Sequence, residues 1–321
     1  MDLTKVRAFT FPGQGSQAVG MGAELAAAFG TARQVFEEVD EALKQKLSEV
    51  MFKGPESELT LTANAQPALM ALSVAGVRVL ERDGRIDLPN VARLVAGHSL
   101  GEYSALVAAG ALQLGDAARL LRRRGVAMQA AVPLGEGAMA ALLGLDLAAA
   151  REVAEGASKG PNGFEVCATA NDNAPGQVVV SGARAAVERA IAIAKTKGAK
   201  RAILLPVSAP FHCPLMKPAA EAMAEALSQV TLAPPRVPLV ANVTARATSD
   251  PATIKKLLVE QVTSLVRWRE CIQYIKAQGV AEVVEIGAGR VLTGLAKRIE
   301  PELAALSIQG PAEIEAFLKT L

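Results

Sequence analysis

A serine in a turn bracketed by glycines is the residue whose setting most clearly suggests chemistry. Residues 97–101 read Gly-His-Ser-Leu-Gly, an apolar run at 94–96 precedes them, and a helical pattern follows. Strand, Gly-x-Ser-x-Gly and helix in this order are typical of a nucleophile elbow, which lifts a serine hydroxyl off the sheet beside a helix N-terminus that favours negative charge. A surface turn that happens to hold a serine is the alternative. We predict that Ser99 is a nucleophile.

A serine nucleophile needs a base, and the sequence has only 2 histidines. His98 adjoins Ser99, and neighbouring side chains in a sharp turn point apart, so we expect His98 to pack or to form hydrogen bonds. By elimination the base is His212, in the Pro-Phe-His-Cys segment at 210–213. It lies farther from the chain end than the histidine of ordinary α/β-hydrolases. No acidic residue stands out as its partner, so a neutral acceptor such as a backbone carbonyl could orient the ring.

An oxyanion formed at this serine would need hydrogen-bond donors aimed at the developing charge. The amide of Leu100, directly after the nucleophile, is the expected first donor. The Gly-Gln-Gly loop at 13–15, which includes Gln14, is the natural source of the second. A phosphate-binding loop is the other interpretation of these glycines, but neither the Walker nor the dinucleotide spacing fits.

The elements that must position these residues alternate between strand and helix, as α/β architecture requires. A first strand at 7–11 and the elbow strand at 94–96 are separated by helix-rich sequence. Helical patterns are predicted at 21–29, 33–50, 64–80 and 114–131. In the C-terminal part we predict strands at 237–242 and 280–286, helices at 253–261 and 266–278, and a last helix after Gly289.

The predicted strands and helices of residues 133–207 follow a β-α-β-β-α-β order, which is the split pattern of a ferredoxin-like domain. The strands are predicted at 138–145, 164–170, 177–181 and 200–207, and the helices at 147–157 and 183–198. We therefore predict an α/β protein in which residues 1–132 and 208–321 form a large α/β-hydrolase-like domain that carries the elbow. Residues 133–207 form a small ferredoxin-like domain inserted into it.

The composition excludes several classes of protein. Hydrophobic residues make up 51% of the chain, enough for a sizeable core, and a net charge of +2 gives no general attraction to nucleic acid. No signal peptide is recognisable, and no apolar run approaches the ~18 residues of a membrane span. Three widely spaced cysteines suggest neither disulfides nor a zinc site. We expect a cytoplasmic monomeric enzyme that binds no nucleic acid or membrane and uses no metal or other cofactor.

Seven segments, in order along nearly the whole chain, resemble the malonyl-CoA:acyl-carrier-protein transacylase family. They lie at 11–17, 97–103, 124–129, 175–177, 210–213, 266–268 and 285–294. The resemblance implies ping-pong transfer of a malonyl group from coenzyme A to Ser99, and then to the phosphopantetheine thiol of an acyl carrier protein in fatty acid synthesis. The thioester is a substrate, and the partners are malonyl-CoA and the carrier.

The resemblance also implies roles for further residues. Arg124 binds the malonyl carboxylate, Gln261 orients His212 through its backbone carbonyl, and Gln14 and Leu100 form the oxyanion hole. The residues placed close to the acyl or pantetheine group are Gln66, Met128 and Asn173.

Arg124 also suits the role on chemical grounds, because a guanidinium matches a carboxylate with two parallel hydrogen bonds and stays charged when desolvated. It follows Arg122 and Arg123 on a predicted helix, where consecutive side chains point about 100° apart, so the three cannot share one solvated face. Three alternatives share much of this site: a serine hydrolase or thioesterase that accepts water, a transacylase for a polyketide carrier, and a catalytically silent module that binds acyl carriers.

Overall fold

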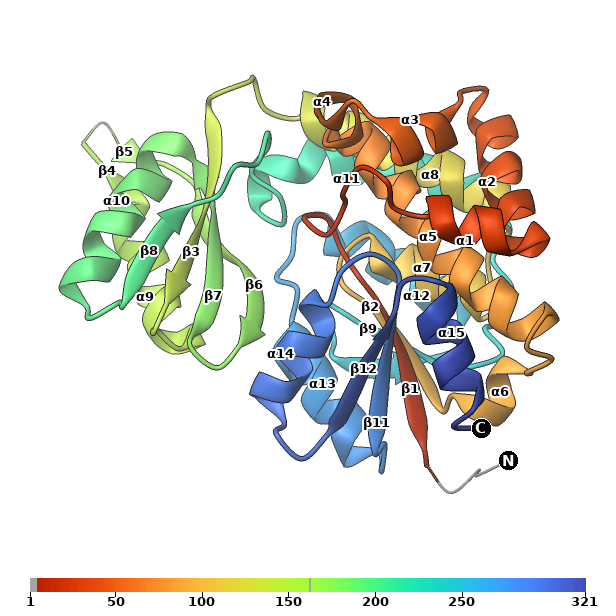
Figure 1. The fold of residues 1–321 in the computed structure, drawn as a ribbon. Helices are drawn as coiled ribbons and strands as arrows, with labels where there is room; N and C mark the ends of the chain where they lie inside the picture. Colours follow the sequence, from red (N-terminus) through yellow and green to blue (C-terminus); the bar gives the residue numbers. More distant parts are fainter. Residues whose placement is uncertain (1–4, 162) are drawn as a thin grey trace.

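The computed structural model describes residues 5–161 and 163–321, and it shows a mixed α/β fold with two principal sheets (Figure 1). The larger sheet has six strands, and they run parallel except for the antiparallel pair at one edge. In spatial order the strands are β10 Arg246–Thr248, β9 Leu239–Ala241, β2 Leu94–Gly97, β1 Arg7–Phe11, β11 Glu282–Ile286 and β12 Ala304–Ile308. No helix in the described ranges is both long and apolar enough to cross a membrane.

Helices cover both faces of the larger sheet, which explains why its central strands β1, β2 and β11 are buried along their whole length. Successive side chains of a strand point to opposite faces. Accordingly, Phe9 joins the core beneath α5 (Thr62–Arg82) and α7 (Gly101–Ala108), whereas Ala8 joins the core beneath α13 (Trp268–Ala277) and α14 (Val291–Ile299). The remaining helices of this part are α1 Ala23–Ala28, α2 Gly30–Leu43, α3 Leu47–Lys53, α4 Glu56–Leu59, α6 Leu88–Val91, α8 Leu114–Ala130, α11 Lys217–Ser228, α12 Pro251–Gln261 and α15 Pro311–Leu318, with a short 3-10 turn at Pro214–Met216.

Two predictions for this part were wrong. The helix expected at 33–50 is two helices, α2 and α3, because the chain turns at Lys44, which adopts a left-handed conformation with φ 50°. The helix after Gly289 is not the last element, since β12 and α15 follow it. Strand β12 is an edge strand whose residues are mostly exposed or half-buried.

The smaller sheet has four antiparallel strands in the order β6-β7-β3-β8, with two helices packed on one face. Along the chain the elements are β3 Gly137–Leu143, α9 Leu147–Ala157, β6 Cys167–Ala174, β7 Gln177–Ala183, α10 Arg184–Thr196 and β8 Arg201–Leu204. The predicted β-α-β-β-α-β order is confirmed. A small hairpin of β4 (Lys159–Gly160) and β5 (Gly163–Phe164) precedes β6.

The strand predicted at 164–170 was misplaced, because Phe164 belongs to the hairpin and β6 continues to Ala174. Because β6 continues to Ala174, its end reaches the part of the chain that carries the larger sheet. Asn171 forms an isolated parallel bridge with Val266, and the N–H of Asp172 donates to the carbonyl of Val266 at 2.9 Å. Through this bridge, the smaller sheet contacts the segment between α12 and α13 rather than a strand of the larger sheet.

Candidate active site

The strand, turn and helix predicted around Ser99 are present, and two glycines make the turn possible. A Cβ atom on Gly97 would lie 1.8 Å from the carbonyl carbon of Gly101, and one on Gly101 would lie 2.3 Å from the carbonyl oxygen of Phe11. Neither position can accept a side chain. Ser99 itself adopts φ 53°, a left-handed conformation that costs free energy for a residue with a Cβ and that is concentrated at functional sites.

The hydroxyl of Ser99 lies at the end of a hydrogen-bonded chain. Its Oγ is 2.8 Å from Nε2 of His212, and Nδ1 of His212 is 2.8 Å from the backbone carbonyl oxygen of Gln261, the last residue of α12. A carbonyl can only accept, so Nδ1 carries the proton and Nε2 is free to accept the serine proton. The neutral acceptor anticipated for His212 is therefore a backbone carbonyl.

The histidine is buried, and burial, reinforced by the positive charge of Arg124, lowers the pKa of His212 to about 3. A general base acts in its neutral form, which predominates above its pKa. We therefore expect kcat/KM for acylation to show no loss from His212 protonation when the pH falls from about 7 to about 5. Initial-rate measurements across this range test the expectation. A steep fall centred near 6.5, the ordinary imidazole pKa, would contradict it.

Two side chains to which the sequence assigned no role hold the elbow in place. Asn242 follows β9; its Oδ1 accepts the Ser99 N–H at 2.8 Å and its Nδ2 donates to the Gly97 carbonyl at 2.7 Å. Glu102, in the first turn of α7, accepts the N–H of Asn242 at 2.6 Å. Because β9 runs parallel to β2, its carboxyl end reaches the elbow. The sequence feature that could have indicated this role is the polar residue Asn242 at the end of the strand predicted at 237–242.

The three arginines of α8 diverge as the helical spacing requires. Arg122 is half-buried and donates to Gln45, whereas Arg123 is exposed and pairs with Glu225 at 2.9 Å. Only Arg124 turns inward, and its side chain is fully buried. Its Nη2 lies 3.1 Å from the Oγ of Ser99, which places one guanidinium directly at the candidate nucleophile.

Amide oxygens accept from both Nη atoms of the buried Arg124 guanidinium, whereas its Nε has no hydrogen-bond partner among the described residues. Nη1 donates to the Oε1 of Gln66 at 2.8 Å, and Nη2 donates to the Oε1 of Gln261 at 2.8 Å. Burial lowers the pKa of Arg124, although an arginine stays protonated in proteins. No carboxylate in the described residues forms an ion pair with it. The side chain is therefore a buried cation held by neutral acceptors, which suits it to receive an anionic group.

The two predicted oxyanion donors are available. Neither the amide N–H of Leu100 nor that of Gln14 donates a hydrogen bond within the described part of the chain. Gly13 lets its loop approach the elbow closely, because a Cβ there would lie 2.8 Å from the carbonyl oxygen of His98. The side chain of Gln14 points elsewhere and donates to Thr62 at 3.2 Å, so only its backbone can serve.

The other predicted residues lie around this centre. Met128 is buried, and its sulfur is 3.7 Å from Nε2 of Gln66. Asn173, on β6, is 2.8 Å from Nε2 of His98, whose ring packs 5.5 Å from that of Trp268. The prediction that His98 packs and forms hydrogen bonds is confirmed.

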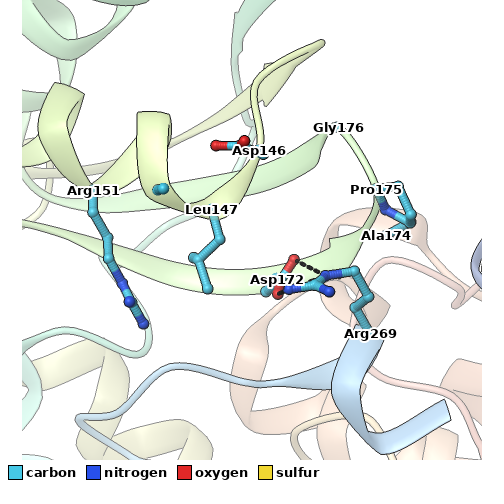
Figure 2. Close-up of a pocket in the computed structure, with 9 residues that line it drawn as sticks. Asp146, Leu147, Arg151, Asp172, Ala174, Pro175, Gly176 and Arg269 are labelled. Atoms are coloured by element: carbon cyan, nitrogen blue, oxygen red, sulfur yellow. Dashed lines mark hydrogen bonds and ion pairs between the residues drawn. The ribbon is translucent and has the colours of Figure 1, made fainter. Parts of the chain in front are cut away.

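A cavity of about 430 Å³ lies on the other side of β6, between the start of α9, the β6–β7 turn and α13 (Figure 2). Asp172 faces it and is held by Arg269, with 2.8 Å between Nη2 and Oδ2. Its neighbour Asn173 points instead to His98. The cavity therefore adjoins the candidate site without containing Ser99.

The elbow, the buried histidine and the buried arginine on an α/β fold define an acyl-transferring enzyme. The chain belongs to the acyl transferase domain family, which it matches over residues 8–300. It is 47% identical to the malonyl CoA-acyl carrier protein transacylase of Bacillus subtilis, a similarity that covers 98% of this chain and 96% of the relative.

Solved structures give the same result. The structure of acyl-carrier-protein S-malonyltransferase from Bartonella henselae has a TM-score of 0.94 to this chain at 57% identity, covering 98% of this chain and 99% of that one. A malonyl-transacylase in complex with a type II PKS acyl-carrier protein also has a TM-score of 0.94, at 43% identity, covering 98% of this chain and 100% of that one.

Proposed function

We propose that this chain is a malonyl-CoA:acyl-carrier-protein transacylase that moves malonyl from coenzyme A to the phosphopantetheine thiol of an acyl carrier protein, feeding fatty acid synthesis. The observation that carries the proposal is Arg124, a buried cation whose Nη2 lies 3.1 Å from the Oγ of Ser99. A malonyl group ends in a carboxylate, and a guanidinium is the side chain best suited to bind one. The full-length similarity to transacylases of this specificity supports the same substrate.

In the proposed first half-reaction, the Oγ of Ser99 attacks the thioester carbon while its proton passes to Nε2 of His212. The amides of Leu100 and Gln14 stabilise the oxyanion. When the carbon–sulfur bond breaks, the proton on His212 passes to the departing coenzyme A sulfur, and malonyl remains as an ester on Ser99. The second half-reaction reverses these steps with the carrier thiol as nucleophile. The Gln261 carbonyl keeps the imidazole oriented throughout.

Arg124→Ala tests this function. We expect kcat/KM for malonyl-CoA to fall on the order of 10- to 150-fold, because the lost charge-assisted hydrogen bonds are worth about 1.5–3 kcal/mol. Acetyl-CoA has no carboxylate to lose, so its use is retained or improved, and selectivity collapses. The measurement is kcat/KM for both thioesters in wild type and variant.

The matched control is Arg123→Ala on the same helix, which removes an exposed arginine paired with Glu225. It should leave the malonyl-to-acetyl ratio unchanged. An equal loss for both thioesters in Arg124→Ala would assign the residue to the fold or to coenzyme A, and the proposed substrate would then be wrong. Fast release of free malonate without a carrier would favour the hydrolase alternative.

We further propose that residues 1–132 and 208–321 form an α/β-hydrolase-like domain and that residues 133–207 form an inserted ferredoxin-like domain. The parallel sheet with its elbow supports the first assignment. The antiparallel order β6-β7-β3-β8, with a hydrophobic cluster of its own, supports the second.

We also propose a cytoplasmic monomer that needs no metal or organic cofactor. The proposed steps support the last point, because serine, histidine and backbone amides supply the nucleophile, the base and the oxyanion donors.

A further inference from the structure

Glu102 is a buried acidic residue to which the proposed reaction gives no role. It is 1% exposed, and each of its carboxyl oxygens accepts from a different N–H donor. Oε1 accepts the backbone N–H of Asn242 at 2.6 Å, and Oε2 accepts Nε2 of the Gln261 side chain. Burial raises the pKa of Glu102 to about 8, although the two donors and the charge of Arg124 oppose that shift. Burial thus favours the neutral acid, whereas the hydrogen bonds favour the carboxylate, because each oxygen has an N–H donor and neither has an acceptor for an acid proton among the described residues. We base the inference on the hydrogen bonds, whose pattern is that of a carboxylate.

The side-chain amide of Gln261 joins Glu102 to the acyl site. Its Nε2 end donates to Glu102 and, at 3.0 Å, to the carbonyl of Ser99, whereas its Oε1 end accepts from Nη2 of Arg124 at 2.8 Å. A carboxylate only accepts and a guanidinium only donates. The amide therefore satisfies both neighbours in one orientation only. If it turned end for end, its NH2 group would face the donors of Arg124 and its oxygen would face the carboxylate.

We propose that Glu102 is a positioning residue that acts through Gln261 to hold the Arg124 guanidinium where it binds the acyl carboxylate, and so helps to set acyl selectivity. The inference rests on the proposed function, because it concerns the malonyl carboxylate. Glu102 and the Ser99 carbonyl both accept from the amide NH2 group and so select the amide orientation, and the amide oxygen holds Nη2 within 3.1 Å of the Oγ of Ser99.

Simple electrostatics gives the opposite expectation. Glu102 carries a negative charge near the place proposed for the malonyl carboxylate, and like charges repel. If Glu102 acted only as a nearby charge, its neutralisation would improve the use of malonyl-CoA. If it acts through Gln261, neutralisation worsens it. The sign of the effect therefore separates the two explanations.

The test is Glu102→Gln, which keeps the size of the side chain but presents an NH2 group to one of its two donors. We expect kcat/KM for malonyl-CoA to fall on the order of tenfold, chiefly through KM, because the carboxylate contact is weakened. Acetyl-CoA use should change less than about twofold, since no contact of the acetyl group depends on Arg124. Labelling of Ser99 by a fluorophosphonate measures how far the loss of the Glu102–Asn242 contact disturbs the elbow, and a loss of labelling as large as the loss of malonyl-CoA use would overturn the inference.

A double-mutant cycle shows whether Glu102 acts through Arg124. In the Arg124→Ala background, Glu102→Gln should have almost no further effect on malonyl-CoA. Gln261→Met provides a second route if Glu102→Gln does not fold, because it removes the connecting amide and leaves both partners in place. Because Gln261 also donates to the Ser99 carbonyl and orients His212 through its backbone, we expect some loss for both thioesters and a larger loss for malonyl-CoA.

The control for loss of a buried carboxylate is Glu285→Gln on β11. Glu285 is also 1% exposed and accepts the backbone N–H groups of Leu292 and Thr293 at 3.1 and 2.8 Å, away from the elbow. Its replacement should lower the thermal unfolding temperature and leave the malonyl-to-acetyl ratio unchanged.

Three further results would overturn the inference: equal losses for both thioesters in Glu102→Gln, improved use of malonyl-CoA, or an undiminished loss in the Arg124→Ala background. Failure of the proposed function looks different. In that case wild type itself would show no preference for malonyl-CoA, and Arg124→Ala would not change it.

Discussion

Ser99→Ala is expected to abolish both acyl-enzyme formation and transfer to the carrier. The substitution removes the only hydroxyl that lies within hydrogen-bonding distance of Nε2 of His212 among the described residues. Without it, neither half-reaction has a nucleophile that the base can activate. Intact-protein mass spectrometry after mixing with malonyl-CoA should show one added malonyl group on wild type and none on the variant.

Ser104→Ala is a matched control for this prediction. Ser104 is a fully buried serine on α7, the helix that follows the elbow, and its hydroxyl has no hydrogen-bond partner in the part of the chain that the structure describes. Its removal should leave acylation intact. A malonyl ester that still forms on Ser99→Ala at the wild-type rate would show that another residue is the nucleophile.

The parts of the site that could be predicted from the sequence depend on local geometry. The elbow could be predicted because consecutive residues form it. The glycines at 97 and 101 are needed where the strand turns this sharply into the helix. The inward position of Arg124 also has a local basis, since helical rotation separates it from Arg122 and Arg123. His212 followed from elimination, because only 2 histidines exist.

The parts that could not be predicted depend on contacts between distant segments. Gln261 meets His212, Arg124 and Glu102 only because α12 ends beside the elbow, and no local pattern indicates where a helix end will pack. Asn242 reaches Ser99 because β9 adds to the sheet next to β2, a neighbour relation that sequence order does not give. The role of Gln261 was predicted only from the resemblance to a family. The structure adds the contact between its backbone carbonyl and Nδ1 of His212.

The same distinction applies to the fold. Central strands such as β1 and β11 are buried along their whole length, and their apolar residues located them well even though each strand also contains a charged residue. Strand β12 is only partly buried and lies at the edge, so it was missed together with α15 behind it. Two strands of the insert continue beyond the predicted ends, and the extension of β6 is what brings Asn173 to His98.

His212→Ala is expected to slow both half-reactions by about 10²- to 10⁴-fold, the usual contribution of a positioned general acid–base. In the first half-reaction the imidazole removes the Ser99 proton, and its conjugate acid then protonates the departing coenzyme A. In the second half-reaction it activates the carrier thiol in the same way. Because one residue serves both steps, the malonyl ester on Ser99 should form slowly and also persist. Rapid-quench measurements of ester formation and of its transfer to the carrier would resolve the two rates.

The control for this prediction is His98→Gln, which removes the other histidine but keeps a side-chain amide near Asn173. It should slow the reaction far less, because His98 contacts Asn173 and Trp268 rather than the serine hydroxyl. If His212→Ala slowed only one half-reaction, the two steps would use different bases, and the symmetric mechanism would be wrong. Slowing of both, with an ester that accumulates and can be chased to the carrier, is the outcome that a single buried imidazole held by the Gln261 carbonyl requires.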